Sequence, residues 1–207
     1  MERICGHTYD EFLELARRFH GYPAPGLVAG GFMVDLALHN LPSGILFDAI
    51  AETDSCLPDA IQMLTPCTVG NGWLKVLDLG RYAICLYDKY EGSGVRVFAD
   101  PARFERWPEV KTWLLKLKPK SEQDSALLLD QLREAGGDLF GVTPVRIRQH
   151  LLAKRSKGSI TLCPACGEPF PARDGARCRG CGDETPYETK PAGAPDAVRL
   201  PTTSERT

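Results

Sequence analysis

Hydrophobic positions in the first half of the chain repeat first with a helical period and then with a strand-like one. A capping box of Thr8 and Glu11 precedes apolar residues on one helical face, which predicts a helix from about Tyr9 to Phe19. Residues 27–39 are mostly apolar and predict a buried helix. Further elements are predicted as a short helix over 59–64 and strands over 45–53, 74–79, 82–88 and 95–99. Short connections between the later strands favour an antiparallel sheet.

The second half of the chain is predicted to be mainly helical. A helix over 101–118 should break at Pro108, and a second should run over 121–135 with Ser121 capped against Asp124. Thr143-Pro144 is typical of a helix start and predicts a basic helix to about Lys154. We therefore expect an α+β fold, with N-terminal helices on an antiparallel sheet, then helices and a small tetracysteine zinc ribbon. The expected domains are an α+β core over 1–140, a basic connecting helix over 141–160, a zinc ribbon over 161–187 and a disordered tail over 188–207.

Composition and charge narrow the class of protein. A chain of 207 residues with 43% hydrophobic and 25% charged residues is typical of one soluble core plus a small module. An N-terminus without a signal-peptide pattern and the lack of a membrane-length apolar run lead us to expect the cytoplasm. The net charge of −2 argues against a whole-protein nucleic-acid binder. Residues 143–181 nevertheless hold eight basic and two acidic residues, which indicates either a partner surface or a solubilising one.

Two cysteine pairs near the C-terminal end carry the strongest chemical signal. Cys163 and Cys166, and then Cys178 and Cys181, form two Cys-x2-Cys pairs. Zn²⁺ prefers four such ligands at tetrahedral corners, and each pair supplies two sulfurs from one tight turn. Two disulfides are the alternative, but the spacing and the missing secretory segment favour structural zinc.

A second metal site is predicted in the core domain. His20 ends the first helix, while Cys56 and Cys67 bracket the short helix, so the three side chains supply enough ligands for a zinc ion with one open position. The alternative is scattered core cysteines and a capping histidine, and Cys5 and Cys85 are interpreted in that way. Glu52 and Asp59 are the candidate catalytic bases at such a site, or else capping and ligand-orienting groups.

Four motifs in the first 100 residues resemble those of one family. They are His20-Gly21-x-x-x-Pro25-Gly26-Leu27, Glu52-Thr53-x-x-Cys56-x-x-Asp59-Ala60-Ile61-Gln62, Thr65-x-Cys67-Thr68-x-Gly70-x-Gly72 and Asp78-x-Gly80-Arg81. In this order they resemble the FmdE family, which takes its name from formylmethanofuran dehydrogenase. The resemblance implies an α+β core with a metal site built from His and Cys side chains, an appended zinc ribbon in some members, and a homodimer. The family usually reads His-Gly-His-x-Cys-Pro-Gly-Leu, whereas this chain has Tyr22 and Ala24 at the second His and the Cys.

Three functions are compatible with these residues. The first is a metal-binding accessory or regulatory protein related to molybdenum or tungsten formylmethanofuran dehydrogenase, with two zinc ions per chain, a small-molecule ligand at the core site and a protein partner on the ribbon. The second is a stand-alone zinc enzyme, hydrolase or deaminase, that uses metal-activated water; the usual deaminase signatures are absent. The third, a nucleic-acid-binding regulator, is disfavoured because the C-terminal module has few aromatic residues for stacking.

Overall fold

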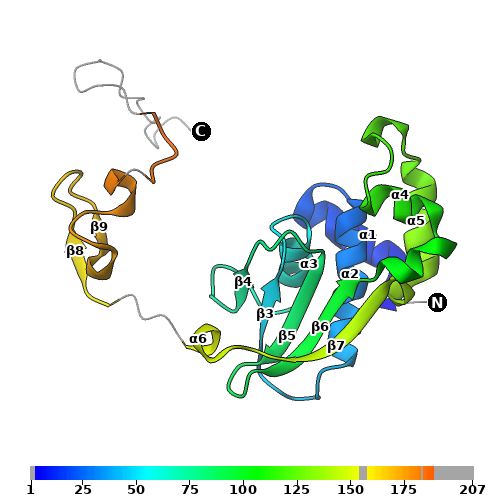
Figure 1. Ribbon diagram of the computed structural model, residues 1–207, viewed down its shortest axis with the longest axis horizontal. Coiled ribbons are helices and arrows are strands. Elements are labelled where there is room, and N and C mark those ends of the chain that lie inside the picture. The colour runs from blue at the N-terminus through cyan, green and yellow to red at the C-terminus, as the bar shows by residue number, and fades with distance from the viewer. Residues whose placement is uncertain (1–2, 154–157, 183, 189–207) are drawn as a thin grey trace, which may run out of the picture. The chain divides into compact units, whose positions relative to one another are not determined.

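The computed structural model describes residues 3–153, 158–182 and 184–188. The chain divides into two compact units, Met1–Ala153 and Lys154–Thr207. The first unit, which we call the core unit, contains all the larger helices and one five-stranded sheet (Figure 1). The second, which we call the zinc-finger module, contains a small two-stranded sheet and short 3₁₀ turns. The expected α+β class is thus confirmed.

The core unit has six α-helices and three 3₁₀ helices within its described residues. The α-helices are α1 (Tyr9–His20), α2 (Pro25–His39), α3 (Leu57–Leu64), α4 (Pro108–Leu114), α5 (Ser125–Ala135) and α6 (Gln149–Leu152). The 3₁₀ helices are η1 (Pro101–Arg106), η2 (Lys120–Glu122) and η3 (Gly136–Leu139). The capping box is present as expected, because the Thr8 hydroxyl accepts from Glu11 N and the Glu11 carboxylate accepts from Thr8 N.

The strands of the core unit form one sheet in the order β4-β3-β5-β6-β7, beside a small β1-β2 pair. Their bounds are β1 (Arg3–Ile4), β2 (His7–Thr8), β3 (Phe47–Ala51), β4 (Leu74–Val76), β5 (Ala83–Asp88), β6 (Ser93–Ala99) and β7 (Phe140–Arg146). Helix α2 packs against β5 and β6 and places most of its side chains in the main core. Its length is buried almost throughout, which explains its nearly uniform apolar sequence.

Two glycines of α2 allow this tight packing. A Cβ added at Gly30 would lie 2.7 Å from the Cβ of Ala60 in α3, and one at Gly31 would lie 2.6 Å from the Phe12 ring in α1. Helix α2 therefore contacts both neighbours through its backbone. This close approach fixes the starts of α2 and α3 relative to one another, and the candidate site lies at those helix starts.

One strand pairing differs from the expected antiparallel sheet. β4 pairs with β3 in parallel, with Ala49 opposite Leu74, whereas the other neighbours in the sheet are antiparallel. Helix α3 lies in the connection between β3 and β4, and a parallel pair requires a crossover of this kind. The chain then passes directly from β4 to β5, but these strands are not neighbours, so their short connection does not make them an antiparallel pair.

The predicted basic helix over 141–160 was wrong. Thr143 and Pro144 lie in β7, an edge strand paired only with β6 among the described strands, where a proline without an N–H is tolerated. The core unit continues through α6 to Ala153, so it does not end at residue 140. Residues 154–157 and 189–207, on which the rest of this helix and most of the predicted tail fall, lie outside the described residues.

A smaller correction concerns the start of α5. Asp124, and not Ser121, is its N-cap, because the Asp124 carboxylate accepts from the backbone N–H groups of Ala126 and Leu127. The break expected at Pro108 is confirmed, since η1 ends before it and α4 begins at it. None of the helices in the described ranges combines the length and apolar character needed to span a bilayer.

Candidate metal centres and the cavity beside the core site

Four thiols converge in the zinc-finger module. The Sγ atoms of Cys163, Cys166, Cys178 and Cys181 all lie within 4.8 Å of one another. Among the described residues this is the only group of three or more His, Cys, Asp or Glu side chains so placed. All eight cysteines are free, so the alternative of two disulfides finds no support. Four convergent sulfurs form a donor set that suits Zn²⁺, with no coordination position left open.

Short local elements build this cluster. Cys163 and Cys166 follow β8 (Ile160–Leu162), which pairs with β9 (Pro169–Pro171), whereas Cys178 and Cys181 lie at η5 (Arg179–Gly182), which follows η4 (Ala172–Asp174). Gly167 takes a φ of 77° and donates its N–H to the Cys163 carbonyl at 2.8 Å. The N–H of Cys178 donates to Cys163 Sγ at 3.5 Å. The turns thus direct backbone donors at sulfur, which stabilises thiolates.

These contacts divide the four thiols electrostatically. Backbone N–H donors, chiefly that of Cys178, lower the pKa of Cys163 to about 6. The Cys181 thiol, facing the sulfurs of Cys178 and Cys166, has its pKa raised to about 12. Backbone dipoles alone therefore do not stabilise four thiolates at neutral pH. A divalent cation supplies the missing positive charge, and metal binding to such thiols releases protons.

In the core unit, His20 pairs with a carboxylate. His20 Nδ1 lies 2.6 Å from Asp59 Oδ2, and the histidine side chain is 19% exposed. His20 is the last residue of α1, and Asp59 lies in the first turn of α3. A carboxylate on Nδ1 fixes the ring orientation and directs Nε2 outward, the arrangement usual for metal-binding histidines. Asp59 therefore acts as an orienting group, which was the alternative to its role as a base.

Cys56 lies beside this pair, at the start of α3. Asp59 is also a neighbour of the Cys56 thiol: burial first, and then the Asp59 charge, raise the pKa of Cys56. Cys56 has a φ of 56°, a left-handed conformation that is rare for a residue other than glycine. Its sulfur also lies against α2, because a Cβ added at Gly26 would be only 2.8 Å from Sγ. Such strain is held by the surrounding packing and is common at functional sites.

Cys67 lies apart from the other two predicted ligands. It follows the C-terminal end of α3, whereas Cys56 precedes the N-terminal end, and eight helical residues separate those ends by roughly 12 Å. The Cys67 thiol is fully buried and donates to the Phe47 carbonyl at 3.5 Å. Burial raises its pKa to about 11. The three predicted ligand atoms are accordingly not within 4.8 Å of one another.

Glu52 is committed to ion pairs. Arg96 donates to both of its carboxylate oxygens, at 2.7 and 2.8 Å, and Arg81 donates to one at 2.8 Å. The hydrogen bonds from Arg96 lower the pKa of this buried carboxyl. A carboxylate bound by two guanidinium groups is a poor proton acceptor, so this arrangement ties β3 to β6 and disfavours Glu52 as a general base. Cys85 is buried in the sheet as expected, and Cys5 donates its N–H to Asp35.

Sequence reasoning missed a cavity of about 980 Å³ beside the core site. It is lined by the loop before α2 and its start, the start of α3 and the segment from α4 to α5: Tyr22, Pro23, Ala24, Pro25, Gly26, Ser55, Cys56, Tyr82, Trp113, Lys116, Leu117, Lys118, Pro119, Lys120, Gln123, Ser125, Leu128 and Leu129. The Tyr22 ring lies 5.3 Å from that of His20, which places the His20–Asp59 pair next to the cavity. Tyr22 and Ala24, the two positions that depart from the FmdE pattern, both lie on its wall.

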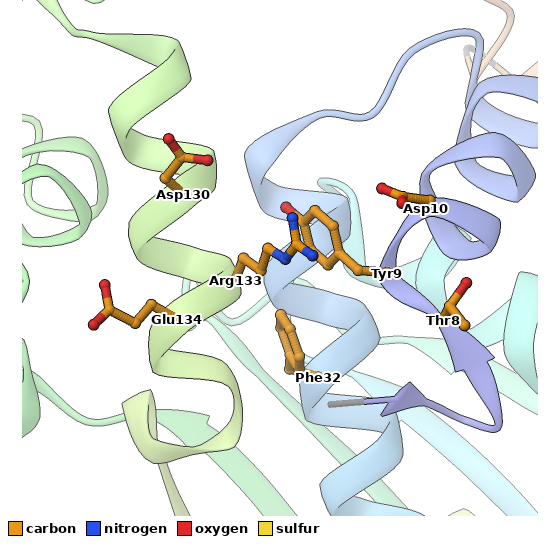
Figure 2. A pocket seen from close by; sticks show the side chains of 7 residues that line it. All are labelled: Thr8, Tyr9, Asp10, Phe32, Asp130, Arg133 and Glu134. Carbon is orange, nitrogen blue, oxygen red and sulfur yellow. The ribbon is translucent and has the colours of Figure 1, made fainter. Parts of the chain in front are cut away.

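Another cavity, of about 430 Å³, lies between α1 and α5 (Figure 2). Arg133 reaches from α5 to place its guanidinium 4.9 Å from the Tyr9 ring, and Tyr9 donates its hydroxyl to the Leu129 carbonyl at 3.3 Å. The carboxylates of Asp10, Asp130 and Glu134 lie around this contact. These interactions tie the first helix to α5, and the cavity contains none of the predicted metal ligands.

The fold and the cysteine cluster together define a zinc-binding protein with an α+β core and a C-terminal zinc finger. A family model described as "FmdE, Molybdenum formylmethanofuran dehydrogenase operon" matches residues 19–145, and one described as "FmdE treble clef zinc finger" matches residues 154–188. The chain belongs to the FmdE family. The zinc predicted for the tetracysteine site is thereby supported by both sequence and geometry.

Two known proteins are similar to this chain. The crystal structure of an FmdE-like protein of tungsten formylmethanofuran dehydrogenase, from Syntrophus aciditrophicus, is 51% identical, with a TM-score of 0.85, and the match covers 91% of this chain and 100% of that one. A "Probable S-adenosyl-L-methionine-binding protein" from Archaeoglobus fulgidus is 26% identical over 183 residues, covering 81% of this chain and 47% of that protein. The chain thus spans about half the length of that curated relative.

Proposed function

We propose that this FmdE-family protein is an accessory or regulatory component related to formylmethanofuran dehydrogenase, with a structural zinc in its C-terminal module and a second metal ion in its core unit. One observation carries the proposal: the His20–Asp59 pair lies beside the Cys56 thiol at the edge of the cavity. An imidazole oriented by a carboxylate and an adjacent thiol are both ligands that Zn²⁺ prefers.

The proposed core site differs from the finger site in being incomplete. His20 and Cys56 supply two ligands, and Cys67 would have to leave its buried position to supply a third. Tyr22 and Ala24, where the family pattern has His and Cys, lie on the wall of the same cavity. We therefore propose that this chain binds its core metal weakly and completes the coordination with a bound molecule or a second protomer. The homodimer and a protein partner on the zinc-finger module belong to the same proposal.

The stand-alone zinc enzyme is not adopted, because Glu52 is held by Arg81 and Arg96 and Asp59 is held by His20. Binding of S-adenosyl-L-methionine, the ligand in the name of the Archaeoglobus protein, is not adopted either. Among the described residues that line the cavity there are three lysines and no carboxylate, which disfavours a sulfonium cation.

Metal stoichiometry tests the proposal. Elemental analysis of protein reconstituted with excess zinc and then desalted should give two ions per chain. Cys56→Ser should reduce this to one by removing a core ligand. Cys67→Ser, the matched control, should leave it at two because its sulfur is turned into the core. One ion per chain in the unsubstituted protein would contradict the proposed core metal.

A gain-of-function variant tests the same site from the opposite direction. Tyr22→His with Ala24→Cys restores the family pattern and should tighten core metal binding at least about tenfold, because two donors are added to an unsaturated ion. Tyr22→Phe with Ala24→Ser is the matched control, since it alters the same positions and adds neither donor. Competition with a chromophoric zinc chelator measures both. Equal affinities in the two variants would place the metal elsewhere.

A further inference from the structure

The cavity beside Cys56 has the size and the wall of a small-molecule site. Its volume of about 980 Å³ is at the upper end of the range usual for organic ligands. Tyr82 and Trp113 form part of its wall, with their rings 6.1 Å apart and nearly perpendicular. The Tyr82 hydroxyl donates to the Gly26 carbonyl at 2.6 Å, which leaves mainly the ring to face a ligand. This wall suits an aromatic or apolar body.

The opposite property, a concentrated positive charge, comes from one short segment. Lys116, Lys118 and Lys120 all line the cavity and are exposed. Among the described residues, none of these three lysines takes part in a salt bridge, and the cavity lining includes no Asp or Glu. Three unpaired ammonium groups beside a low-dielectric wall produce a local potential that attracts anions.

The backbone of this lysine segment, residues 116–120, is held in place. Lys116 has a φ of 52°, in the left-handed region, and Leu117 N–H donates to the Thr112 carbonyl at 2.9 Å. The side-chain amide of Gln123 donates to the Lys118 carbonyl at 2.9 Å. The fold thus holds the lysines along one side of the cavity by specific hydrogen bonds, and it does so at the cost of an uncommon backbone conformation.

We infer that this cavity binds an organic anion with an aromatic or apolar body, whose carboxylate or phosphate group contacts the lysine segment. The body lies against Tyr82 and Trp113, and its far end reaches toward Cys56. This inference rests on the proposed function for the link between ligand and core metal, since Tyr22 and Cys56 line the same cavity. Binding of the anion itself requires no core metal and is measured without one.

Two dyes of matched shape test the inference on the full zinc-loaded chain without added core metal. 8-Anilinonaphthalene-1-sulfonate is an aromatic anion, and N-phenyl-1-naphthylamine is its counterpart without the sulfonate. At low salt the anion should bind one per chain and about tenfold tighter than the neutral dye, a preference that added salt reduces. Fluorescence titration measures both affinities. Equal affinities, or no binding of the anion, would overturn the inference.

Substitutions locate the site. Lys118→Gln with Lys120→Gln should weaken anion binding about fivefold and leave the neutral dye within about twofold. Arg17→Gln with Arg18→Gln removes the same charge from α1, outside the cavity lining, and should change neither affinity. Ser125→Phe, which fills the cavity from an exposed position, should weaken both dyes. Anion binding that responds to the arginine pair as much as to the lysine pair would refute the assignment.

The dye and metal experiments fail separately. Two zinc ions per chain with no anion preference would remove the ligand class and keep the proposed core metal. One zinc per chain with the expected dye results would remove the core metal and leave the anion site standing.

Discussion

The zinc-finger module and the core site place cysteines at similar local positions but use them differently. In the module, four thiols from two short turns converge within 4.8 Å and saturate a tetrahedral ion. In the core, one thiol and one oriented histidine lie beside an open cavity, and the second candidate cysteine is buried at the other end of α3. A saturated site stabilises a fold, whereas an unsaturated site next to a cavity leaves room for a ligand.

The largest expected effect separates the two regions by their dependence on metal. Cys178→Ser should abolish the cooperative fold of the zinc-finger module, because structural zinc contributes on the order of 10 kcal/mol to the folding of such domains. The core unit has its own hydrophobic core and should keep its amide signals. Two-dimensional NMR of the amides measures both outcomes at once. Loss of the core signals as well would show that the two units fold as one.

A smaller effect is expected where α2 meets the core site. In Gly26→Ala the new methyl group would lie 2.8 Å from Cys56 Sγ and 2.9 Å from the Tyr82 hydroxyl, and such overpacking costs about 1–3 kcal/mol. Urea unfolding of the core unit measures the loss. Gly137→Ala is the matched control, because a Cβ there meets nothing within 4 Å. If Gly26→Ala is as stable as the control, the start of α2 is not tightly packed on Cys56.

The sequence predicted the parts of the fold that depend on local pattern. The capping box at Thr8, the apolar α2 and the break at Pro108 are short-range features, and all were confirmed. The parallel pairing of β4 was not predictable from the length of its connection to β5, because those two strands are separated by β3. Thr143-Pro144 suits a helix start and an edge strand equally, and the pairing with β6 decides between them.

The same distinction between local and long-range features applies to the sites. Two Cys-x2-Cys pairs bring their sulfurs together by local turns, so spacing alone identified the finger. Spacing could not reveal that α3 separates Cys56 from Cys67, since that depends on the three-dimensional path of the chain. The alternation Lys116-Leu117-Lys118 is typical of the end of a helix. The lysines of this segment become informative only when Tyr82 and Trp113 are seen on the same cavity.

The smallest effect that we predict concerns Asp59, the carboxylate shared by His20 and Cys56. Asp59→Asn keeps the size of the side chain but removes the charge that orients His20, and should weaken core metal binding about tenfold, or about 1.4 kcal/mol. Asp54→Asn is the control, because that exposed carboxylate accepts only from Ser55 Oγ among the described contacts and should change nothing. Zinc-chelator competition measures both, and the finger zinc provides an internal reference that neither variant should affect. An unchanged core affinity in Asp59→Asn would mean that the His20–Asp59 pair only ties α1 to α3, in which case the core unit would be a scaffold for the cavity and not a metal site.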